Sequence, residues 1–500
     1  MNAAETTPIL IPGKNFAPAR LGRVLVVGLG KSGMAAVSYC EALLGTRVES
    51  IMVSAGTRTA DAEAFAAAHA GDGIEFRFEY EDIEGAFDVC IVSPGISDLS
   101  ALYASAKRAS AEMLSELEFA WRESDANARW VAITGTNGKT TTTSLIAHIL
   151  TSAGVRAHAV GNIGEVALTC VRSNPQDVYV AEISSFQLAT TSRFSPDVAV
   201  MLNITPDHVE WHGSFERYVE AKARLFANYE GDSRPTAIFD CTNDITREMC
   251  DTFASTHPNA RIVRMQTPEE SAAAAAQSLS GAAGVRDGHL VADLCGLHDL
   301  GPEDALQIKG FHNVLNALAA GCAAIALGVS DSDVRRFLTD FAPLEHRIEP
   351  CGVFDGVSWY NDSKGTNVDS TVKAVSAFAP GSVICLLGGH DKGTDLAPLV
   401  QAARRGCKAV VCYGEARARF LAAFGAADLA DGESQSAGGI LVMAAPGMRE
   451  ATRAAGAFAS PGDVVLLSPA CSSFDEFTSY GQRGRVFKAL VAAEFGSHER

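Results

Sequence analysis

The sequence has no long apolar run, no cluster of basic residues and no paired cysteine motif. Its 12 cysteines are scattered, which predicts reduced, mostly buried thiols in a cytosolic protein rather than a disulfide framework. A formal net charge of −18 without any Lys/Arg run argues against non-specific nucleic-acid binding. The N-terminus lacks a signal-peptide pattern, and the most apolar expected helix, residues 314–329, is shorter than a bilayer span. We therefore expect a cytoplasmic protein with no membrane insertion.

Residues 130–150 carry the strongest local pattern. An apolar run predicts a buried strand, the segment G-T-N-G-K-T follows, and a helical pattern begins at Lys139. In such a turn the backbone N–H groups bind an anion, Lys139 adds positive charge, and Thr140 offers a hydroxyl to Mg²⁺. The usual motif has a glycine where this chain has Ile133, so this is a shortened phosphate-binding loop. The alternative is an ordinary strand-to-helix turn with a solvated lysine.

A second glycine-rich turn, G-L-G-K-S-G at residues 28–33, follows a predicted strand at residues 23–27. A G-x-G-x-x-G spacing after a strand is typical of a Rossmann-like domain. A dinucleotide site also needs an acidic residue at the end of the second strand, and the segment I-M-V-S-A-G-T-R has none. An NAD-dependent oxidoreductase is therefore disfavoured. Another phosphate-bearing ligand and a turn used only for packing both stay open.

Polar residues follow the predicted strands of the central region. Glu182 lies near the end of an apolar strand, where a lone carboxylate is costly unless it is paired or binds a metal. The alternative for Glu182 is a cap of the next turn. His208, in the turn T-P-D-H, is either a metal or phosphate contact or a structural histidine. Lys222 lies on a mixed polar helix face, and its spacing alone predicts a solvated side chain.

Later turns are also polar. Asn313 and Asn316, spaced i and i+3, share a helical face, either as ligand-binding amides or as a helix cap. The segment N-D-S-K-G-T-N places Asp362 and Lys364 beside a glycine after a strand. Two later strands end in G-G-H-D-K-G-T-D and S-P-A-C-S-S-F-D-E-F. Because ligands bind at the carboxyl ends of parallel strands, these turns predict a cleft.

The length and the order of elements predict the fold class. A chain of 500 residues is too long for one core and suggests about three domains. Strands and helices alternate, which favours parallel sheets. We predict an α/β protein with a Rossmann-like N-terminal domain, a central P-loop ATPase-like parallel-sheet domain and a Rossmann-like C-terminal domain. The domains are placed at residues 1–118, 119–343 and 344–500, and residues 111–122 are expected to form one amphipathic helix.

With these motifs the chain resembles the Mur ligase family, which makes the peptide stem of bacterial cell-wall precursors. The resemblance runs from about residue 24 to residue 488. G-T-N-G-K-T, T-P-D-H and G-F-H-N-V-L-N suit the whole family, folate polyglutamate ligases included. G-L-G-K-S-G, E-I-S-S-F-Q-L, N-D-S-K-G-T-N and S-P-A-C-S-S-F-D-E-F together are similar to the D-glutamate-adding branch. The D-N-P-R motif of the branch that adds a diamino acid is absent.

The resemblance implies roles for residues at matching positions. The ATP-binding residues would be Gly135, Thr136, Asn137, Gly138, Lys139, Thr140, Thr141, Asn313, Asn316, Arg347 and Asp362. Thr140, Glu182, His208 and a carbamylated Lys222 would hold Mg²⁺ at two sites; Lys139, Glu182, His208 and Lys222 would be catalytic. The UDP-sugar would contact Lys31, Ser32, Thr57, Arg58, Ser93 and Asn162. The D-glutamate pocket would contain Thr366, Lys392, Ser473 and Tyr480. The family often has an acidic residue where Gly56 precedes Thr57, so the uridine contacts stay open.

The resemblance also implies the reaction. We expect an ATP-dependent, Mg²⁺-requiring ligase, a monomer with small-molecule substrates, that joins D-glutamate to UDP-N-acetylmuramoyl-L-alanine through an acyl phosphate. The three domains would bind the UDP-sugar, ATP and the amino acid in chain order. A folylpolyglutamate-type ligase shares the central loop but needs no UDP-binding N-terminal domain. A P-loop switch or motor needs no amino-acid pocket. ATP hydrolysis that requires both a UDP-sugar and an amino acid would separate these alternatives.

Overall fold

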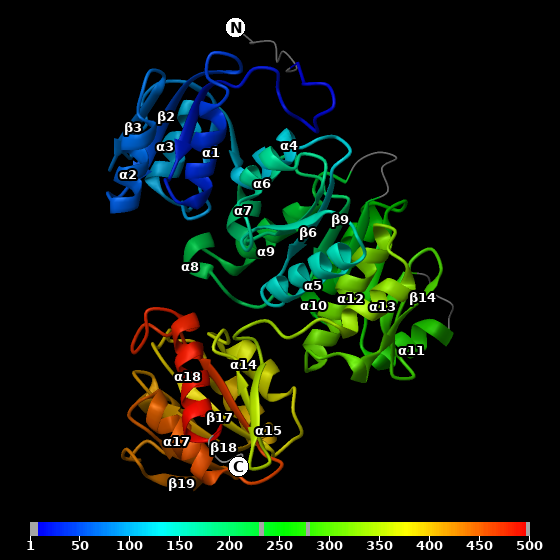
Figure 1. Ribbon diagram of the computed structural model, residues 1–500, viewed down its shortest axis with the longest axis vertical. Coiled ribbons are helices and arrows are strands. Elements are labelled where there is room, and N and C mark those ends of the chain that lie inside the picture. The colour runs from blue at the N-terminus through cyan, green and yellow to red at the C-terminus, as the bar shows by residue number, and fades with distance from the viewer. Residues whose placement is uncertain (1–8, 230–234, 277–280, 497–500) are drawn as a thin grey trace. The chain divides into compact units, whose positions relative to one another are not determined.

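The computed structural model describes residues 9–229, 235–276 and 281–496 (Figure 1); the other residues lie outside the described part. The chain divides into two compact units, Met1–Asp304 with Leu315–Leu338, and Ala305–Val314 with Thr339–Arg500. Both units are built on largely parallel sheets with helices between the strands, which confirms the predicted α/β class. No helix in the described ranges is long and apolar enough to cross a membrane.

The first sheet, coloured blue to cyan in Figure 1, is parallel throughout with strand order β3-β2-β1-β4-β5. Its strands are β1 (Gly22–Val27), β2 (Val48–Gly56), β3 (Ile74–Phe78), β4 (Phe87–Val92) and β5 (Ser110–Ser115). Helices α1 (Lys31–Glu41), α2 (Ala60–His69) and α3 (Ala101–Ala109) connect them. The strand–glycine turn–helix order at β1 and α1 is the predicted Rossmann-like start.

Residues 111–122 do not form the single helix expected from their pattern. They divide between β5 and α4 (Glu116–Glu123), because residues 110–115 pair with β4 as an edge strand. Ser115 ends the strand and caps the helix, since its side chain accepts a hydrogen bond from the Glu118 N–H. The prediction of one helix is therefore wrong, and strand pairing is the reason.

The central sheet has the strand order β14-β13-β12-β11-β10-β9-β6-β8-β7. Its strands are β6 (Arg129–Thr134), β7 (Ala157–Gly161), β8 (Val178–Glu182), β9 (Val198–Met201), β10 (Thr236–Asp240), β11 (Arg261–Met265), β12 (Ala282–Arg286), β13 (His289–Asp293) and β14 (Leu297–Pro302). Strands β7 to β12 pair in parallel, and β12, β13 and β14 form an antiparallel extension. Strand β6 lies between β8 and β9, so the loop that follows it has strand ends on both sides.

Helices accompany the central sheet. They are α5 (Lys139–Ser152), α6 (Ala167–Ser173), α7 (Ser185–Ala189), α8 (Val209–His212), α9 (Phe215–Ala223), α10 (Asp244–Thr256), α11 (Pro268–Ala276), α12 (Phe311–Ala326) and α13 (Asp331–Thr339), with short 3-10 turns at Arg224–Phe226 and Glu303–Ala305. The boundary between the compact units falls within α12, between Val314 and Leu315. The twelve cysteines, all within the described residues, are free thiols, and most are buried, as predicted.

An N-terminal arm, residues 13–16, runs along the segment that follows α4. The Asn15 N–H donates to the Ser124 carbonyl at 3.2 Å, and the Ala126 N–H donates to the Gly13 carbonyl at 2.9 Å. Phe16 stacks on Trp121 with ring centroids 5.4 Å apart. The arm therefore covers the connection between the first sheet and β6.

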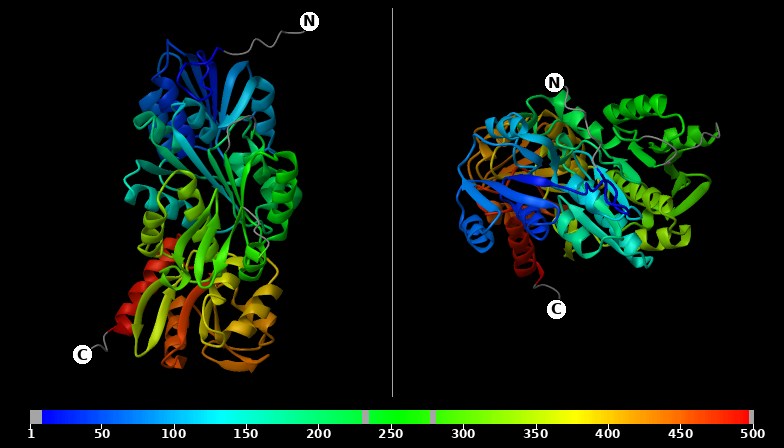
Figure 2. Two further views of the ribbon diagram at one scale, coloured as in Figure 1. Left: turned by 90° about the vertical axis from the view of Figure 1, so that its right-hand side faces the viewer. Right: turned by 90° about the horizontal axis from the view of Figure 1, so that it is seen from above.

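The C-terminal unit contains the third sheet, with strand order β15-β16-β21-β17-β18-β20-β19 (yellow to red in Figure 2). Its strands are β15 (Glu349–Phe354), β16 (Val357–Asn361), β17 (Val383–Gly388), β18 (Cys407–Tyr413), β19 (Ser434–Ala437), β20 (Ile440–Ala444) and β21 (Val464–Ala470). Its helices are α14 (Val368–Val375), α15 (Ala397–Gly406), α16 (Arg417–Phe424), α17 (Met448–Phe458) and α18 (Tyr480–Glu494). The last strand, β21, pairs in parallel with both β16 and β17 and so joins the two halves of the sheet.

Candidate active site

The predicted phosphate loop leaves the carboxyl end of β6 and leads into α5. Gly135 and Gly138 have φ angles of 147° and 91°, a region that favours glycine. A Cβ atom at Gly135 would lie 2.8 Å from Leu202 Cβ, and one at Gly138 would lie 2.5 Å from Asn316 Oδ1. The loop therefore needs glycine at both positions, for its backbone conformation and for space.

The amino end of α5 has the features of an anion site. Its N-cap residue is Gly138, so no side chain caps the first N–H groups of the helix. Those N–H groups and the helix dipole favour a negative ligand. Lys139 bends back over the loop, and its Nζ donates to the carbonyl oxygens of Gly135 and Thr136 at 2.8 and 2.9 Å. This arrangement fits the phosphate groups of a nucleotide with a cation beside them.

Two neighbouring segments hold the loop in place. Asn203, just after β9, accepts from the Asn137 N–H at 3.0 Å and donates to the Asn137 carbonyl at 3.1 Å. The Thr136 hydroxyl shares a hydrogen bond with the Tyr218 hydroxyl at 2.8 Å and donates to the Thr205 carbonyl at 3.1 Å. Neither Asn203 nor Tyr218 stands out in the sequence as a site residue. The position of Asn203, next to the T-P-D-H turn, was the available signal.

Glu182 ends β8 beside the loop, and its side chain is buried. Its Oε1 accepts a hydrogen bond from the Asn162 amide at 2.8 Å. Its Oε2 is buried and has no hydrogen-bond partner among the described residues. A buried carboxylate oxygen without a partner is costly, and a divalent cation would remove that cost. The donor chemistry at Glu182 therefore fits a hard cation such as Mg²⁺.

Lys222 is almost completely buried, at 1% exposure, so the expectation of a solvated side chain from its spacing is wrong. The reason is that α9 turns its Tyr218 and Lys222 side toward the phosphate loop. The Lys222 Nζ donates to the Gly135 carbonyl at 2.8 Å and lies 4.7 Å from the centre of the Tyr218 ring. Burial, helped by the nearby Lys139 charge, lowers the pKa of Lys222 well below its usual value. A lowered pKa favours the unprotonated, nucleophilic form of the amine.

Two histidines flank this region. His208 is the N-cap residue of α8 with a φ of 51°, and half of its side chain is exposed. His212, which the sequence analysis missed, is buried, and its Nε2 lies 2.9 Å from the Ser185 hydroxyl. Burial lowers the pKa of His212 to about 4, so it is neutral at ordinary pH. Its position four residues after His208 was the available signal.

The residues predicted to hold a UDP-sugar lie mostly at the carboxyl edge of the first sheet. They follow β1 (Lys31 and Ser32), β2 (Thr57 and Arg58) and β4 (Ser93), and β1 pairs with both other strands. The Ser93 hydroxyl donates to the Gly28 carbonyl at 3.1 Å. Arg58 pairs with Glu63 at 3.1 Å. Asn162 belongs instead to the central sheet, where it binds Glu182.

The edge of the first sheet is joined to the central sheet within one compact unit. Ser97, in the turn after β4, donates from its hydroxyl to the Trp211 carbonyl at 2.9 Å. Asp98 pairs with Arg217 of α9 at 2.6 Å. These contacts connect the predicted UDP-sugar edge to the segment that carries His208 and Lys222.

The two predicted asparagines of α12 have different surroundings. The Asn316 Oδ1 accepts from the Thr142 hydroxyl of α5 at 3.2 Å, beside Gly138. Asn316 therefore supports the phosphate loop. The Asn313 amide donates to the Lys309 carbonyl at 2.8 Å, one turn earlier in the chain, and Asn313 belongs to the C-terminal unit.

In the C-terminal unit Asp362 follows β16 and is buried. Its two oxygens accept from the Ser468 hydroxyl at 2.6 Å and from the Ile348 N–H at 3.3 Å. Burial raises the pKa of Asp362 to about 7, although the Ser468 hydrogen bond and the Arg347 charge oppose this. Arg347, predicted to bind the nucleotide, is therefore close enough to act electrostatically on Asp362.

The residues predicted to form the amino-acid pocket lie on neighbouring turns. The Lys392 Nζ donates to the Thr366 carbonyl at 3.0 Å, and the Lys364 Nζ lies 3.8 Å from the centre of the Tyr480 ring. Arg483, which the sequence analysis missed, is fully buried and joins these turns. Its guanidinium donates to the Ser363 hydroxyl and carbonyl and to the carbonyls of Cys471 and Ser472, at 2.9 to 3.1 Å. Ser473, the remaining residue predicted for the amino-acid pocket, directly follows Ser472 in the chain.

Two other features have structural explanations. Glu345, His346 and Glu349 offer ligand atoms within 4.8 Å of one another, but the Lys488 ammonium already binds both carboxylates at 2.8 Å.

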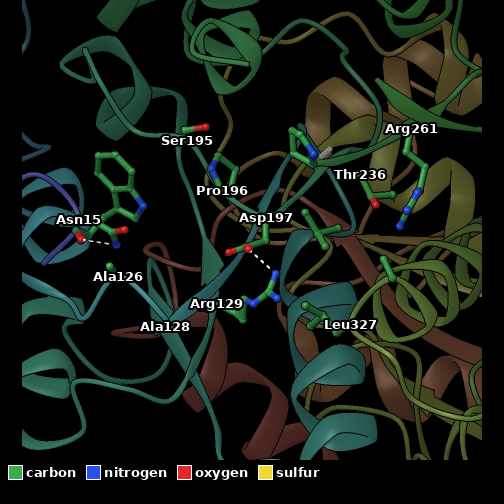
Figure 3. Close-up of a pocket in the computed structure, with 14 residues that line it drawn as sticks. Asn15, Ala126, Ala128, Arg129, Ser195, Pro196, Asp197, Thr236, Arg261 and Leu327 are labelled. Atoms are coloured by element: carbon green, nitrogen blue, oxygen red, sulfur yellow. Dashed lines mark hydrogen bonds and ion pairs between the residues drawn. The ribbon is translucent and has the colours of Figure 1, made fainter. Parts of the chain in front are cut away.

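A pocket of about 350 Å³ lies at the amino ends of central strands, opposite to the phosphate loop, and Figure 3 shows Arg129 paired with Asp197 there. Neither feature contains a residue of the predicted active site.

Comparisons with known proteins extend over nearly the whole chain. Family profiles match the Mur ligase middle domain over residues 133–324 and the Mur ligase, glutamate ligase domain over residues 346–471. This chain is also similar to curated proteins named UDP-N-acetylmuramoylalanine–D-glutamate ligase. The one from Acidobacterium capsulatum is 38% identical, covering 95% of this chain and 97% of its own. The one from Koribacter versatilis is 36% identical, covering 94% and 97%.

Solved structures support the fold. UDP-N-acetylmuramate-alanine ligase from Thermotoga maritima matches with a TM-score of 0.52 at 18% identity, covering 94% of this chain and 99% of its own. The UDP-N-acetylmuramoylalanyl-D-glutamyl-2,6-diaminopimelate–D-alanyl-D-alanyl ligase from Acinetobacter baumannii matches with a TM-score of 0.53 at 16% identity, covering 94% and 93%. At such identities the likeness confirms the predicted architecture and carries no further argument.

Proposed function

Because this chain belongs to the Mur ligase family, we propose that it joins D-glutamate to UDP-N-acetylmuramoyl-L-alanine and converts ATP to ADP and phosphate. The observation that carries this proposal is the similarity, over nearly the full chain, to ligases of that name. The chain is thus an ATP-dependent ligase of peptidoglycan precursor synthesis. Its geometry suits the reaction, since a phosphate loop lies beside a buried carboxylate and a buried amine.

The reaction must activate a carboxylate. Amide formation from a free acid and an amine is unfavourable in water, so ATP first phosphorylates the L-alanyl carboxylate. The D-glutamate amine then attacks the acyl carbon, and phosphate leaves. Phosphoryl transfer depends on positioning and on neutralising charge. Here the loop N–H groups and Lys139 would bind the phosphates of ATP.

Mg²⁺ would neutralise charge on the transferred phosphoryl group when it is bound. Thr140, Glu182, His208 and Lys222 are the residues proposed to hold two such ions. The Glu182 oxygen that has no hydrogen-bond partner within the described part of the chain supports this assignment. The remaining proposed nucleotide contacts are Thr136, Asn137, Thr141, Asn313, Asn316, Arg347 and Asp362.

We also propose that Lys222 is carbamylated. Its neutral amine attacks carbon dioxide, a C–N bond forms, and one proton is released, which converts a buried base into an anionic ligand. The lowered pKa of Lys222 supports this step because only the unprotonated amine reacts. After incubation with ¹³C-bicarbonate, a carbamate signal is expected in the NMR spectrum of the protein. The signal should be absent from the Lys222→Met variant.

Substrate selection is assigned to the two outer regions. Residues 1–118 would bind the UDP-sugar through the edge that carries Lys31, Thr57 and Ser93. Residues 119–343 would bind ATP, and residues 344–500 would bind D-glutamate through Thr366, Lys392, Ser473 and Tyr480. We propose a cytoplasmic location, because all three substrates are small molecules of the cytoplasm, and we also propose that the protein is a monomer.

The test is ADP release with Mg²⁺, ATP and UDP-N-acetylmuramoyl-L-alanine, comparing D-glutamate, L-glutamate, L-lysine and no amino acid. Release only with D-glutamate is the expected result. Release with another amino acid would keep the family and change the assigned substrate. No release with any amino acid would contradict the proposal and direct attention to a folylpolyglutamate-type reaction.

A further inference from the structure

Two cysteines, Cys241 and Cys250, lie near each other where β10 leads into α10, the helix labelled α10 in Figure 1. Cys241 directly follows β10, and its N–H donates to the Met265 carbonyl at 2.9 Å. Cys250 lies on the buried face of α10. The two thiol groups lie close enough to interact with each other and with Arg264. Arg264 of β11 donates from Nη1 to Cys250 Sγ at 2.9 Å.

This thiol pair lies just under the protein surface. Cys241 is 4% exposed and Cys250 is fully buried. Arg264 also pairs with the exposed Asp251 at 2.8 Å, so a surface ion pair lies beside the Cys250 sulfur.

The electrostatics of the pair differ from those of the other buried thiols. The hydrogen bond with Cys250 and the Arg264 charge lower the pKa of Cys241. Burial alone acts in the opposite sense, since it raises the pKa of Cys407, in β18, to about 12. A thiol beside a cation and a second thiol is the arrangement in which peroxide oxidation is selective.

We propose that Cys241 and Cys250 form a reversible disulfide when the protein meets a hydroperoxide. The Cys241 thiolate attacks one peroxide oxygen, the O–O bond breaks, and sulfur is oxidised to a sulfenic acid while the other oxygen leaves as water or alcohol. Cys250 then attacks Cys241 Sγ, the S–O bond breaks, and hydroxide leaves and takes up a proton as water. A dithiol reductant reverses the step by thiol–disulfide exchange.

The disulfide has a consequence for the active site, and this part rests on the proposed function. Forming the bond draws the sulfurs to about 2.05 Å and removes the contact of Arg264 with a Cys250 thiol. Cys241 lies two residues before Asn243, which caps α10 and donates to the Ile204 carbonyl at 3.1 Å. The next residue, Thr205, contacts Thr136 of the phosphate loop. Oxidation is therefore transmitted to the loop and slows ligation.

Peptide mapping after exposure to hydrogen peroxide tests the disulfide. Trypsin cuts after Arg247, which lies between the two cysteines, so a disulfide joins two peptides that dithiothreitol separates. The linked pair, two hydrogens lighter than the sum of its peptides, is the expected product. The exposed Cys295 reports that peroxide reached the protein, and Cys385 and Cys407 serve as buried thiols that stay reduced. Oxidised Cys295 with reduced Cys241 and Cys250 would overturn the proposal.

Variants separate the steps. Cys250→Ser should leave Cys241 as a sulfenic acid that a cyclic 1,3-diketone traps, and Arg264→Gln should slow its formation. Oxidation should lower the ligation rate of the wild type, and dithiothreitol should restore it. Cys250→Ser lacks one of the two thiols, so its ligation rate should not show a loss caused by the disulfide. Activity that is unchanged in the fully cross-linked protein would overturn the effect on the loop. If the reduced protein shows no ligation, the proposed function fails while the peptide map still decides on the disulfide.

Discussion

The central sheet and the C-terminal sheet both bury charged side chains at the carboxyl ends of parallel strands, but they satisfy them differently. At the central edge, Glu182 keeps one buried oxygen with no partner among the described residues, and buried Lys222 donates to neutral oxygens. At the C-terminal edge, both oxygens of Asp362 accept hydrogen bonds, and Arg483 donates to four oxygens. The central edge is thus incomplete without a ligand, whereas the C-terminal edge is complete.

This difference indicates two uses of buried charge. An unsatisfied buried charge costs folding free energy, and a ligand that completes it regains that free energy as affinity. A satisfied charge fixes the turns around it before any ligand arrives. We therefore expect substitutions at the central edge to affect catalysis more than stability, and the reverse for the charged groups that hold the C-terminal turns.

The largest expected effect is at Lys139. Lys139→Ala removes the cation beside the phosphate loop, so ATP-dependent ligation should fall by about a thousandfold, as for loss of a strong electrostatic contact in a transition state. The thermal unfolding midpoint without ligands should stay close to that of the wild type. Near-normal turnover by a folded variant would contradict the assignment of the loop.

Glu182→Ala and Asp362→Ala compare the two edges directly. Glu182→Ala should lower the free energy of unfolding by at most about 1 kcal/mol, because one hydrogen bond is lost together with an unfavourable buried charge. Asp362→Ala leaves the Ser468 hydroxyl and the Ile348 N–H without an acceptor and should cost about 3 kcal/mol. Denaturant unfolding without ligands measures both. Equal losses would remove the distinction between the edges.

Gly138→Ala tests the space at the loop. Its Cβ would lie 2.5 Å from Asn316 Oδ1, so the loop must shift and ATP binding should weaken about tenfold or more. Gly154→Ala is the matched control, since its φ of 83° is similar and its Cβ would meet nothing within 4 Å. Both variants should lose about 1 to 2 kcal/mol of stability through backbone strain. Only Gly138→Ala should lose ATP affinity, as measured by calorimetry.

The pH dependence of the C-terminal edge sharpens the comparison further. The pKa of Asp362 is about 7 in the folded state against 3.8 ordinarily, so the folded state binds more protons between these values. The free energy of unfolding should therefore decrease as pH rises from about 4 to about 7. Asp362→Asn should weaken this dependence without removing it, because the pKa of Glu116, buried in the first unit, is also raised to about 7. If the free energy of unfolding of Asp362→Asn decreased with pH as steeply as that of the wild type, the assignment of this pH dependence to Asp362 would be refuted.

Much of the fold follows from local pattern. The glycines after β1 and β6, and the alternation of apolar strands with helices, predict the α/β class because glycine conformation and strand burial are local requirements. The division of residues 110–123 into β5 and α4 was not predictable in this way. A six-residue segment has no decisive period, and its pairing with β4 decides the outcome.

The site was predictable where a residue lies at a strand end and less so elsewhere. Glu182 and the loop glycines stand out in the sequence, because a charged residue or a glycine at the end of a buried strand requires a structural or functional explanation. Lys222 did not stand out in the sequence, because its burial depends on which residues pack against α9. Tyr218 and Arg483 were missed for the same reason, because their partners lie far away in the sequence. The resemblance to a family assigns Lys222 to the site where spacing could not, and that role stays a prediction.

The place of β21 in the third sheet bears on how the protein is synthesised. Because β21 pairs with both β16 and β17, those strands leave the ribosome before the strand that joins them exists. Each presents an unpaired edge to the solvent during that interval, when edge-to-edge aggregation is a hazard. A ribosome that stalls before residue 464 therefore releases a chain with two open half-sheets, which chaperones must hold or proteases must remove.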